Sequence, residues 1–423
     1  MATRRTVLGV GAAALAACVG CSNGGNNTKA AGDETLLLWC WPGGLSDKVL
    51  AAATDHFAGQ ARLTVRIVEG DYKQQLTSAL DEGRDVPAIA GIKGEDVASL
   101  LPRADRFTDL NTLGAGDVKG DYLPWKWQQG STIDGQLIGF PIDIGPNAMF
   151  YRPGLFKKAG LPTEPAAVSE AIPDWAAFLE VGSRCAKALP GVAFVASGTQ
   201  VFSVCLGQGT KRFIDEGNNF IGAEAHVRRA WDFAVGVSRK GLGAAVQSDD
   251  PKWASGIANG KFAVELGAAW HAQDIEQVAP ATRKAWRVAA ASAAGANSGG
   301  SFLAIPAAAD RKDLAMTVIK WLLSPDNQAA AFGDVGLFPS TPASYRMPAL
   351  TAPDAFFGDQ RTIDVFGASA QKVHHVYEAP ADATLADLYL KELKLVEAGK
   401  AAEAAWRDAI AGARATATQL GVN

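Results

Sequence analysis

Two of the five cysteines of the chain, Cys18 and Cys21, are separated by two residues near the N-terminus. Such a pair can form a redox centre at the start of a helix, or half of a zinc site when two further ligands lie nearby. This pair is followed instead by a polar, glycine-rich stretch, which is typical of a flexible tether. The five histidines are scattered, and His374 and His375 are their only cluster. The sequence therefore favours neither a redox centre nor a metal site.

The residues before the pair have the pattern of an export signal. Arg4 and Arg5 give a positive start, an apolar stretch runs from Val7 to Ala17, and small residues precede the first cysteine. This stretch is too short for a bilayer, which needs about 20 helical residues. The two arginines resemble the twin-arginine export pattern, although general-secretion signals also begin in this way. We predict that residues 1–18 direct the chain out of the cytoplasm.

The end of this signal also suggests a lipid anchor. Leu15-Ala16-Ala17-Cys18 resembles the bacterial lipobox, in which the cysteine is acylated and becomes the new N-terminus. Cys21 is the alternative site, but it fits less well because a cysteine stands where the leucine belongs. Residues 19–34 would then be the tether. No later segment has 18 consecutive apolar residues, so we expect lipid alone to hold the protein at the outer face of the cell membrane.

The composition of the chain limits the number of domains and the possible partners. A chain of 423 residues with 48% hydrophobic and 20% charged residues can form two domains with cores of their own. The net charge of -4 provides no basic surface for nucleic acid. Cys40, Cys185 and Cys205 are too few to be a disulfide scaffold, and the last two could form one bridge or be two buried thiols.

Hydrophobic periodicity predicts two α/β units. In the first unit, strands and helices alternate over the ranges 35–41, 47–60, 61–70, 71–85 and 86–92. The pattern returns with predicted elements at 174–189, 191–197, 224–241, 260–270 and 313–324, followed by a helical tail over 385–420. Such alternation is typical of parallel sheets with crossover helices. Ligands of open α/β sheets bind outside the carboxyl ends of the strands, so two facing units could enclose a ligand by hinge closure.

Four segments, 134–161, 173–182, 256–270 and 299–345, resemble one family in their order and spacing. This family is the extracellular solute-binding proteins (family 1) of ABC importers, in the branch that carries carbohydrates. The resemblance implies an α/β fold of the periplasmic-binding-protein type II, with two α/β domains, a hinged interdomain cleft and a helical C-terminal tail. The implied boundaries are 36–145 with 300–345 for the N-terminal lobe, and 146–299 with 346–423 for the C-terminal lobe.

The resemblance also implies ligand-binding residues, which are Trp41, Glu95, Asp96, Asp143, Phe202, Trp270, Gly300, Ser301, Tyr345 and Arg346. These types suit a sugar, because planar polar groups bind hydroxyls in pairs and aromatic faces pack on the C–H surface of the ring. Each has a structural alternative. Glu95 and Asp96 could cap a helix, Asp143 could brace a hairpin, and Gly300 could belong to a turn. Tryptophans at strand ends, including Trp39, could equally be core residues.

The sequence lacks a P-loop, a G-x-S-x-G elbow, an H-E-x-x-H motif and a dinucleotide fingerprint. We therefore expect no enzyme, no metal and no cofactor. The expected function is a substrate-binding lipoprotein that captures a mono- or oligosaccharide and delivers it to an ABC permease, as a monomer without nucleic acid. Glycerol phosphodiesters or polyamines are alternative ligands. An exported glycoside hydrolase remains an alternative because it needs only two carboxylates, although two α/β units are not an eightfold barrel.

Overall fold

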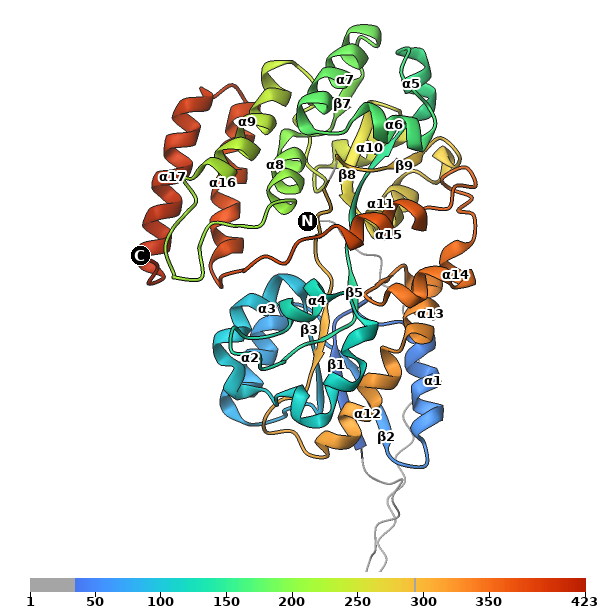
Figure 1. The fold of residues 1–423 in the computed structure, drawn as a ribbon, viewed down its shortest axis with the longest axis vertical. Helices are drawn as coiled ribbons and strands as arrows, with labels where there is room; N and C mark the ends of the chain where they lie inside the picture. Colours follow the sequence, from blue (N-terminus) through green and yellow to red (C-terminus); the bar gives the residue numbers. More distant parts are fainter. Residues whose placement is uncertain (1–34, 293) are drawn as a thin grey trace, which may run out of the picture.

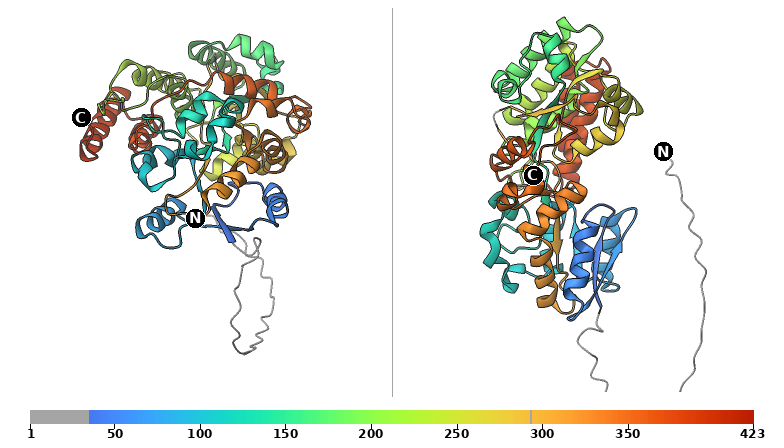
Figure 2. Two further views of the ribbon diagram at one scale, coloured as in Figure 1. Left: turned by 60° about the horizontal axis from the view of Figure 1, so that its bottom comes forward. Right: turned by 90° about the vertical axis from the view of Figure 1, so that its right-hand side faces the viewer.

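The structure is a computed structural model that describes residues 35–292 and 294–423. The predicted export signal and tether, with Cys18 and Cys21, lie outside the described residues. Two β-sheets with surrounding helices form two lobes, one above the other in Figure 1 and in the right-hand view of Figure 2. The α/β class with two domains is therefore confirmed. Within the two described ranges, no helix is long and apolar enough to cross a bilayer.

The N-lobe is built on a five-stranded sheet with the strand order β2-β1-β3-β10-β4. Its strands are β1 (Thr35–Cys40), β2 (Arg62–Ile67), β3 (Ile89–Ile92), β4 (Phe140–Pro141) and β10 (Phe302–Ala304). β1 lies between β2 and β3 and runs parallel to both, as the alternating pattern predicts, whereas β10 runs antiparallel to β3 and β4. The helices of this lobe are α1 (Asp47–Phe57), α2 (Tyr72–Glu82), α3 (Gly94–Leu100), α4 (Pro124–Gln129) and α12 (Lys312–Leu322). Three 3-10 segments, Leu101–Arg106, Leu110–Leu113 and Ala115–Asp121, connect α3 to α4.

The C-lobe is built on a four-stranded sheet with the order β7-β8-β6-β9. Its strands are β6 (Asn147–Tyr151), β7 (Ala193–Val195), β8 (Phe262–Ala268) and β9 (Arg287–Ala289). Its helices are α5 (Pro153–Lys158), α6 (Pro165–Ala171), α7 (Trp175–Ala188), α8 (Gly198–Gly207), α9 (Ala225–Arg239), α10 (Pro251–Ala258), α11 (His271–Val278) and α15 (Ile363–Gln371). Cys185 and Cys205 are both free thiols here, so the alternative of a bridge between them is wrong.

The chain passes between the lobes at several points. β5 (Asp143–Ile144) pairs antiparallel with β11 (Phe338–Pro339) in a small separate sheet. α13 (Pro325–Val335) and the 3-10 segment Pro342–Arg346 contact β11, and α14 (Pro348–Thr351) packs against both of them. In Figure 1 this region lies between the two lobes.

The C-terminal tail forms two helices, α16 (Asp382–Glu397) and α17 (Ala402–Gln419), that pack against each other. α16 also contacts α8 and α9, which are placed beside it in Figure 1. The buried aromatic side chains of Trp231, Tyr389 and Trp406 join these helices in one hydrophobic cluster. The predicted helical tail is therefore present, with one interruption at residues 398–401. The segment 372–381, which we call the α15–α16 linker, has no regular structure and runs along the lower side of the C-lobe.

Candidate functional site

The carboxyl ends of strands from both sheets point to the space between the lobes. Trp41 directly follows β1 and Lys93 follows β3, while Trp270 follows β8 of the other sheet. The ring of Trp41 is partly buried, lies edge to face with Tyr72 at 5.3 Å, and has the Lys93 ammonium 5.6 Å from its centroid. Both sheets thus present tryptophans where open α/β sheets bind their ligands.

Asp143, Gly300 and Ser301 come together where two crossing segments meet. Asp143 is buried, and its Oδ1 accepts a hydrogen bond of 2.7 Å from the backbone N–H of Ser301. Gly300 has a φ of +81°, and a Cβ there would lie 2.6 Å from the carbonyl oxygen of Asp143. Only glycine fits this backbone without a shift. The structure therefore places all three predicted residues together and gives Asp143 a bracing role.

Lys126 of α4 is a buried charged residue near Asp143 and Gly300. No role for it was predicted from the sequence. Its side chain is fully buried, its Nζ donates to Oε1 of Gln129 at 3.0 Å, and it lies 3.6 Å from the ring centroid of Phe302. Burial lowers the pKa of Lys126 to about 7, and the nearby charges of Asp143, Glu378 and Glu95 act in the opposite direction.

Burial also raises the pKa of Asp143, and the charge of Lys126 opposes this shift. The charge of each group therefore offsets part of the free-energy cost of burying the other. The available sequence signal was a lysine placed between Trp125 and Trp127 in a short helix. A lysine in such an apolar setting needs polar or charged partners, and the local sequence pattern does not predict which residues these are.

The interlobe cleft is hollowed at three adjoining places. The outer hollow, about 730 Å³, lies between the α3 end, the hairpin 131–137 and the α15–α16 linker. The inner hollow, about 230 Å³, lies between α3 and α8 and reaches α16. A third and much smaller hollow, which we call the neck, is lined by Gln129, Arg212, Asn297 and linker residues. Glu378 lines all three spaces, so its side chain lies where they border one another.

Two predicted ligand residues line the inner hollow from opposite lobes. Glu95 comes from α3 and is exposed, whereas Phe202 comes from α8 and is only 1% exposed. The Phe202 ring stacks on that of Tyr389 with centroids 6.0 Å apart, so most of it belongs to the C-lobe core. Glu95 is therefore better placed than Phe202 to contact a ligand.

Polar contacts join the lobes across the neck. Nε2 of Gln129, on α4, donates to Oε2 of Glu378 in the linker at 3.3 Å. Oε1 of Glu378 also lies 3.5 Å from a guanidinium nitrogen of Arg212. Sequence reasoning did not find Gln129, Arg212 or Glu378, because they are far apart in the chain and match no spacing rule.

Trp270 is 44% exposed, and its indole N–H donates to the carbonyl of Ser298 at 3.1 Å. The ring is therefore tied to the crossing segment at Ser298 and stays partly accessible. Trp270 lines none of the three hollows, and neither does Trp41. Trp39 is a core residue that is only 4% exposed.

A buried acid–base cluster lies directly behind Trp270. His271 Nδ1 lies 3.1 Å from Oδ2 of Asp274, and its Nε2 lies 3.5 Å from Oε2 of the fully buried Glu265. The rings of Trp253 and Trp270 flank the imidazole at 5.4 and 6.1 Å. Burial alone would lower the pKa of His271, but the two carboxylates outweigh it and raise this pKa to about 9.

The other predicted residues lie away from the hollows. Asp96 is partly buried and pairs with Lys73 at 3.2 Å. Tyr345 is buried, and its hydroxyl donates to the carbonyl of Pro339 at 3.1 Å, whereas Arg346 is exposed. None of the three touches the cleft surfaces described above.

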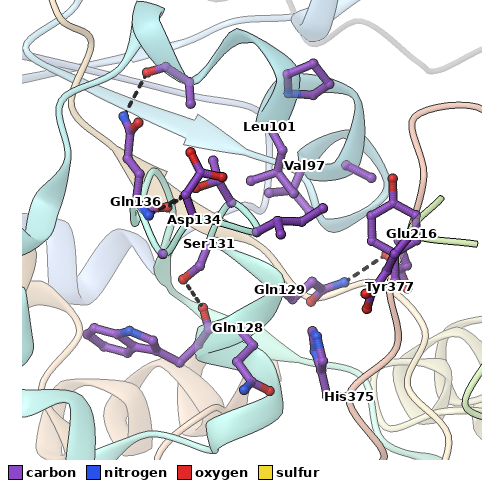
Figure 3. Close-up of a pocket in the computed structure, with 18 of the residues that line it drawn as sticks. Val97, Leu101, Gln128, Gln129, Ser131, Asp134, Gln136, Glu216, His375 and Tyr377 are labelled. Atoms are coloured by element: carbon purple, nitrogen blue, oxygen red, sulfur yellow. Dashed lines mark hydrogen bonds between the residues drawn. The ribbon is translucent and has the colours of Figure 1, made fainter. Parts of the chain in front are cut away.

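The lining of the outer hollow combines polar and apolar side chains. Figure 3 shows Ser131, Asp134 and Gln136 of the hairpin on one side and Tyr377 and Glu216 on the opposite side. Amide, hydroxyl and carboxylate groups around a partly buried tyrosine ring can hold a neutral polyhydroxyl ligand. Among the described residues, no group of three or more histidines, cysteines or carboxylates could hold a metal ion.

Comparison with known proteins agrees with this architecture. The sequence model of the bacterial extracellular solute-binding proteins matches residues 52–358. A crystal structure of an extracellular solute-binding protein of family 1 is similar to this chain, with a TM-score of 0.86 and 27% sequence identity. The match covers 91% of this chain and 100% of that chain.

Two further relatives have names that state a ligand. The lactose-binding protein of Rhizobium radiobacter is 23% identical over 375 residues, which is 83% of this chain and 84% of that protein. The galacto-N-biose-/lacto-N-biose I-binding protein of the ABC transporter from Bifidobacterium longum, in complex with lacto-N-biose, has a TM-score of 0.77 and 18% identity over 93% of this chain and 99% of that chain. From the match over residues 52–358, the chain belongs to the family of bacterial extracellular solute-binding proteins.

Proposed function

We propose that this protein is the substrate-binding component of an ABC importer and that it captures a carbohydrate in the cleft between its lobes. The observation that carries the proposal is the group of hollows between the lobes that share Glu378 as a lining residue and have polar groups of both lobes around them. The relatives named for lactose and lacto-N-biose support a saccharide as the ligand class. The protein acts by binding, and delivery to a permease follows.

The charges that line the cleft favour a neutral sugar over a glycerol phosphodiester. Glu95 and Glu378 line the inner hollow, and buried Asp143 lies close by, against the cations Lys126 and Arg212. Both cations are already engaged by protein carboxylates or amides. An anionic glycerol phosphodiester would therefore be repelled by the Glu95 carboxylate in the inner hollow, whereas a neutral sugar would not. A polyamine remains the relevant control because carboxylates attract it.

Binding is proposed to work by a population shift. The inner hollow is lined by Glu95 of the N-lobe and by α8 and α16 of the C-lobe, so a ligand touches both walls only when the lobes are close. A ligand that binds the closed state more tightly shifts the equilibrium toward it. The closed form is then the state presented to the permease.

We further propose that the mature protein is anchored by lipid at Cys18, or at Cys21, and works as a monomer on the outer face of the membrane. Membership in an extracellular family supports this location. The lobe boundaries at 145/146, 299/300 and 345/346 belong to the same proposal. Mass spectrometry of the mature N-terminus distinguishes the two cysteines.

A thermal-shift screen tests the ligand class. The purified chain without residues 1–34 is heated with mono- and oligosaccharides, and with a glycerol phosphodiester and spermidine as controls. A ligand that binds only the folded state raises Tm, by an amount that grows with the ratio of its free concentration to its Kd. The proposal predicts a rise with at least one neutral saccharide and none with the controls. A rise with spermidine or the phosphodiester alone would contradict it.

A further inference from the structure

The side-chain amide of Asn297 lies between the cleft and two segments that cross between the lobes. Asn297 is half-buried and lines both the inner hollow and the neck. The first crossing segment, residues 142–147, contains β5, which lies between the lobes in Figure 1, and the second, residues 296–301, leads into β10. We infer that Asn297 is a positioning residue that couples ligand binding in the cleft to the relative position of the lobes. This inference rests on the proposed function and identifies a residue that regulates its site.

The amide of Asn297 makes one hydrogen bond to each crossing segment. Its Oδ1 accepts from the backbone N–H of Gly145, in the first segment, at 2.8 Å. Its Nδ2 donates to the carbonyl oxygen of Gly299, in the second segment, at 2.9 Å. Because a backbone N–H only donates and a carbonyl oxygen only accepts, these two partners fix the orientation of the amide. The Asn297 side chain therefore links the two segments at a defined point.

This link bridges the place where the crossing segments can bend most easily. On one side of it, the N–H of Ser298 donates to the carbonyl of Gly145 at 2.9 Å. On the other side, the N–H of Ile142 donates to the carbonyl of Ser301 at 2.8 Å. The two glycines between Ser298 and Ser301 have φ values of +77° and +81°, which glycine adopts without strain. A few such residues can absorb the backbone rotation of a hinge, so a side chain that spans them influences the angle between the lobes.

The Asn297 amide has hydrogen-bonding capacity left for a ligand. An asparagine side chain has two N–H donors and an oxygen with two lone pairs. The bonds to Gly145 and Gly299 use one donor and one lone pair. A sugar hydroxyl both donates and accepts, so it can bind the remaining donor and lone pair from the inner hollow. The amide that contacts the ligand is then the amide that holds the two crossing segments.

The crossing segments are too closely packed at this point to absorb a shift locally. A Cβ on Gly145 would lie 2.0 Å from the carbonyl oxygen of Ser298. The same carbonyl accepts the indole N–H of Trp270, which holds the second segment from the side of the C-lobe. A displacement of the Asn297 amide must therefore move Gly145 or Ser298 with it, since packed elements shift as units. Occupancy of the inner hollow and orientation of the lobes then change together.

Hydrogen exchange of the ligand-free protein tests the link between Asn297 and the hinge. The exchange rate of the Gly145 amide is followed by NMR, and the radius of gyration is measured by small-angle X-ray scattering. In Asn297→Ala the Gly145 N–H has no acceptor, so it should exchange at least about tenfold faster than in wild type. The radius of gyration of this variant should differ from that of wild type. Asn297→Asp keeps an acceptor oxygen and should restore slow exchange at Gly145.

Two matched variants separate this role from a simple ligand contact and from a general loss of stability. Ser203→Ala changes a residue that lines the inner hollow from α8, and it should leave the exchange of Gly145 at the wild-type rate. Asn259→Ala removes an exposed amide that bonds to the carbonyl of Ser255 away from the cleft, and it should change neither measurement. Thermal melting of each variant shows whether it is folded.

Lactose and maltose are the probes for the link between Asn297 and the ligand. Calorimetric titration should show that the sugar that binds wild type more tightly binds Asn297→Ala roughly five- to tenfold more weakly. The same sugar should slow the exchange of Gly145 in wild type and leave it unchanged in Asn297→Ala. A purely structural asparagine would give no such dependence on the sugar. The wild-type comparison needs no variant, so it decides the inference even if Asn297→Ala does not fold.

Two results would overturn the inference while leaving the proposed function intact. One is wild-type exchange of Gly145 in ligand-free Asn297→Ala, which would mean that the amide does not hold the segments. The other is a sugar that binds wild type without changing the exchange of Gly145, which would mean that binding is not coupled through Asn297. If neither sugar nor any other saccharide of the screen bound wild type, the proposed function itself would fail, and the coupling with it.

Discussion

Lys126 and Asp143 stabilise each other's burial at the base of the cleft. The ammonium of Lys126 is fully buried beside the Phe302 ring, and Asp143 accepts a hydrogen bond from Ser301 in the opposite crossing segment. A buried polar group that loses its partner costs more than the bond itself contributes. Replacing Asp143 or removing its acceptor oxygen should therefore destabilise the fold at this point.

Asp143→Ala should lower the free energy of unfolding by about 1–3 kcal/mol, because it leaves the Ser301 N–H without its acceptor and removes a compensating charge near Lys126. Asp143→Asn keeps an acceptor oxygen and should lower the free energy of unfolding by less than Asp143→Ala does. Urea unfolding of both variants measures the difference. Equal losses in the two would show that the hydrogen bond is not what Asp143 contributes.

His271 should make folding pH-dependent in a defined direction. Its pKa is raised from 6.5 to about 9 in the folded state, so its contribution is fully present below pH 6.5 and is lost as pH rises through 9. In His271→Gln this contribution is absent. The stability difference between wild type and variant should therefore shrink on the order of 2–3 kcal/mol across this window.

Urea unfolding at several pH values between 6 and 10 checks this prediction. Comparison with the variant is needed because the pKa of Lys126 is lowered to about 7, and that shift favours folding as pH rises. Glu265 and Asp274 are the titratable groups that face His271, and both are present in wild type and variant. A stability difference that stays constant with pH would contradict the charged state of His271.

At the scale of elements, the sequence predicted what local patterns determine. The alternation β1-α1-β2-α2-β3 was predictable because each element has its own hydrophobic period and caps, such as Ser46, whose hydroxyl accepts from Val49 N–H before α1. The two-residue strands β4, β5 and β11 were not, because distant antiparallel partners determine them. Glu95 was found by resemblance, but Gln129 and Glu378 are 249 residues apart, and only the fold brings them together.

The contact between α3 and the crossing segment leaves no room for a side chain. A Cβ on Gly94 would lie 1.9 Å from the carbonyl oxygen of Gly300, so Gly94→Ala must displace one of the two segments. We expect it to lower the free energy of unfolding by about 1–3 kcal/mol. Gly59→Ala is the matched control, since a Cβ there meets no atom within 4 Å and should be nearly neutral. Thermal unfolding of the two variants tests this, and similar Tm values would contradict the packing described.

At the scale of the whole molecule, the account requires the two lobes to move. Buried contacts such as the bond from Trp125 to the carbonyl of Ala370 hold the lobes together at the crossings, while the bridge from Gln129 to Glu378 spans the cleft. The first can persist during hinge motion, whereas the second must open for a ligand to enter. Ligand should thus favour a more compact molecule.

Small-angle X-ray scattering of the protein with and without the saccharide found in the screen measures this change. The radius of gyration should fall on binding, and Gln129→Ala should increase it in the absence of ligand because one cleft-spanning contact is lost. Identical scattering curves for free and bound wild type would mean that binding does not depend on closure.

Calorimetric titration of the wild type and Glu378→Ala with that saccharide tests the central claim most directly, since Glu378 lines every part of the cleft. The account predicts one saccharide site per wild-type chain and at least about tenfold weaker binding to Glu378→Ala, with Glu180→Ala, an exposed α7 variant, unchanged. Binding to Glu378→Ala with wild-type affinity, or heat only from spermidine or the phosphodiester, would contradict a carbohydrate site between the lobes.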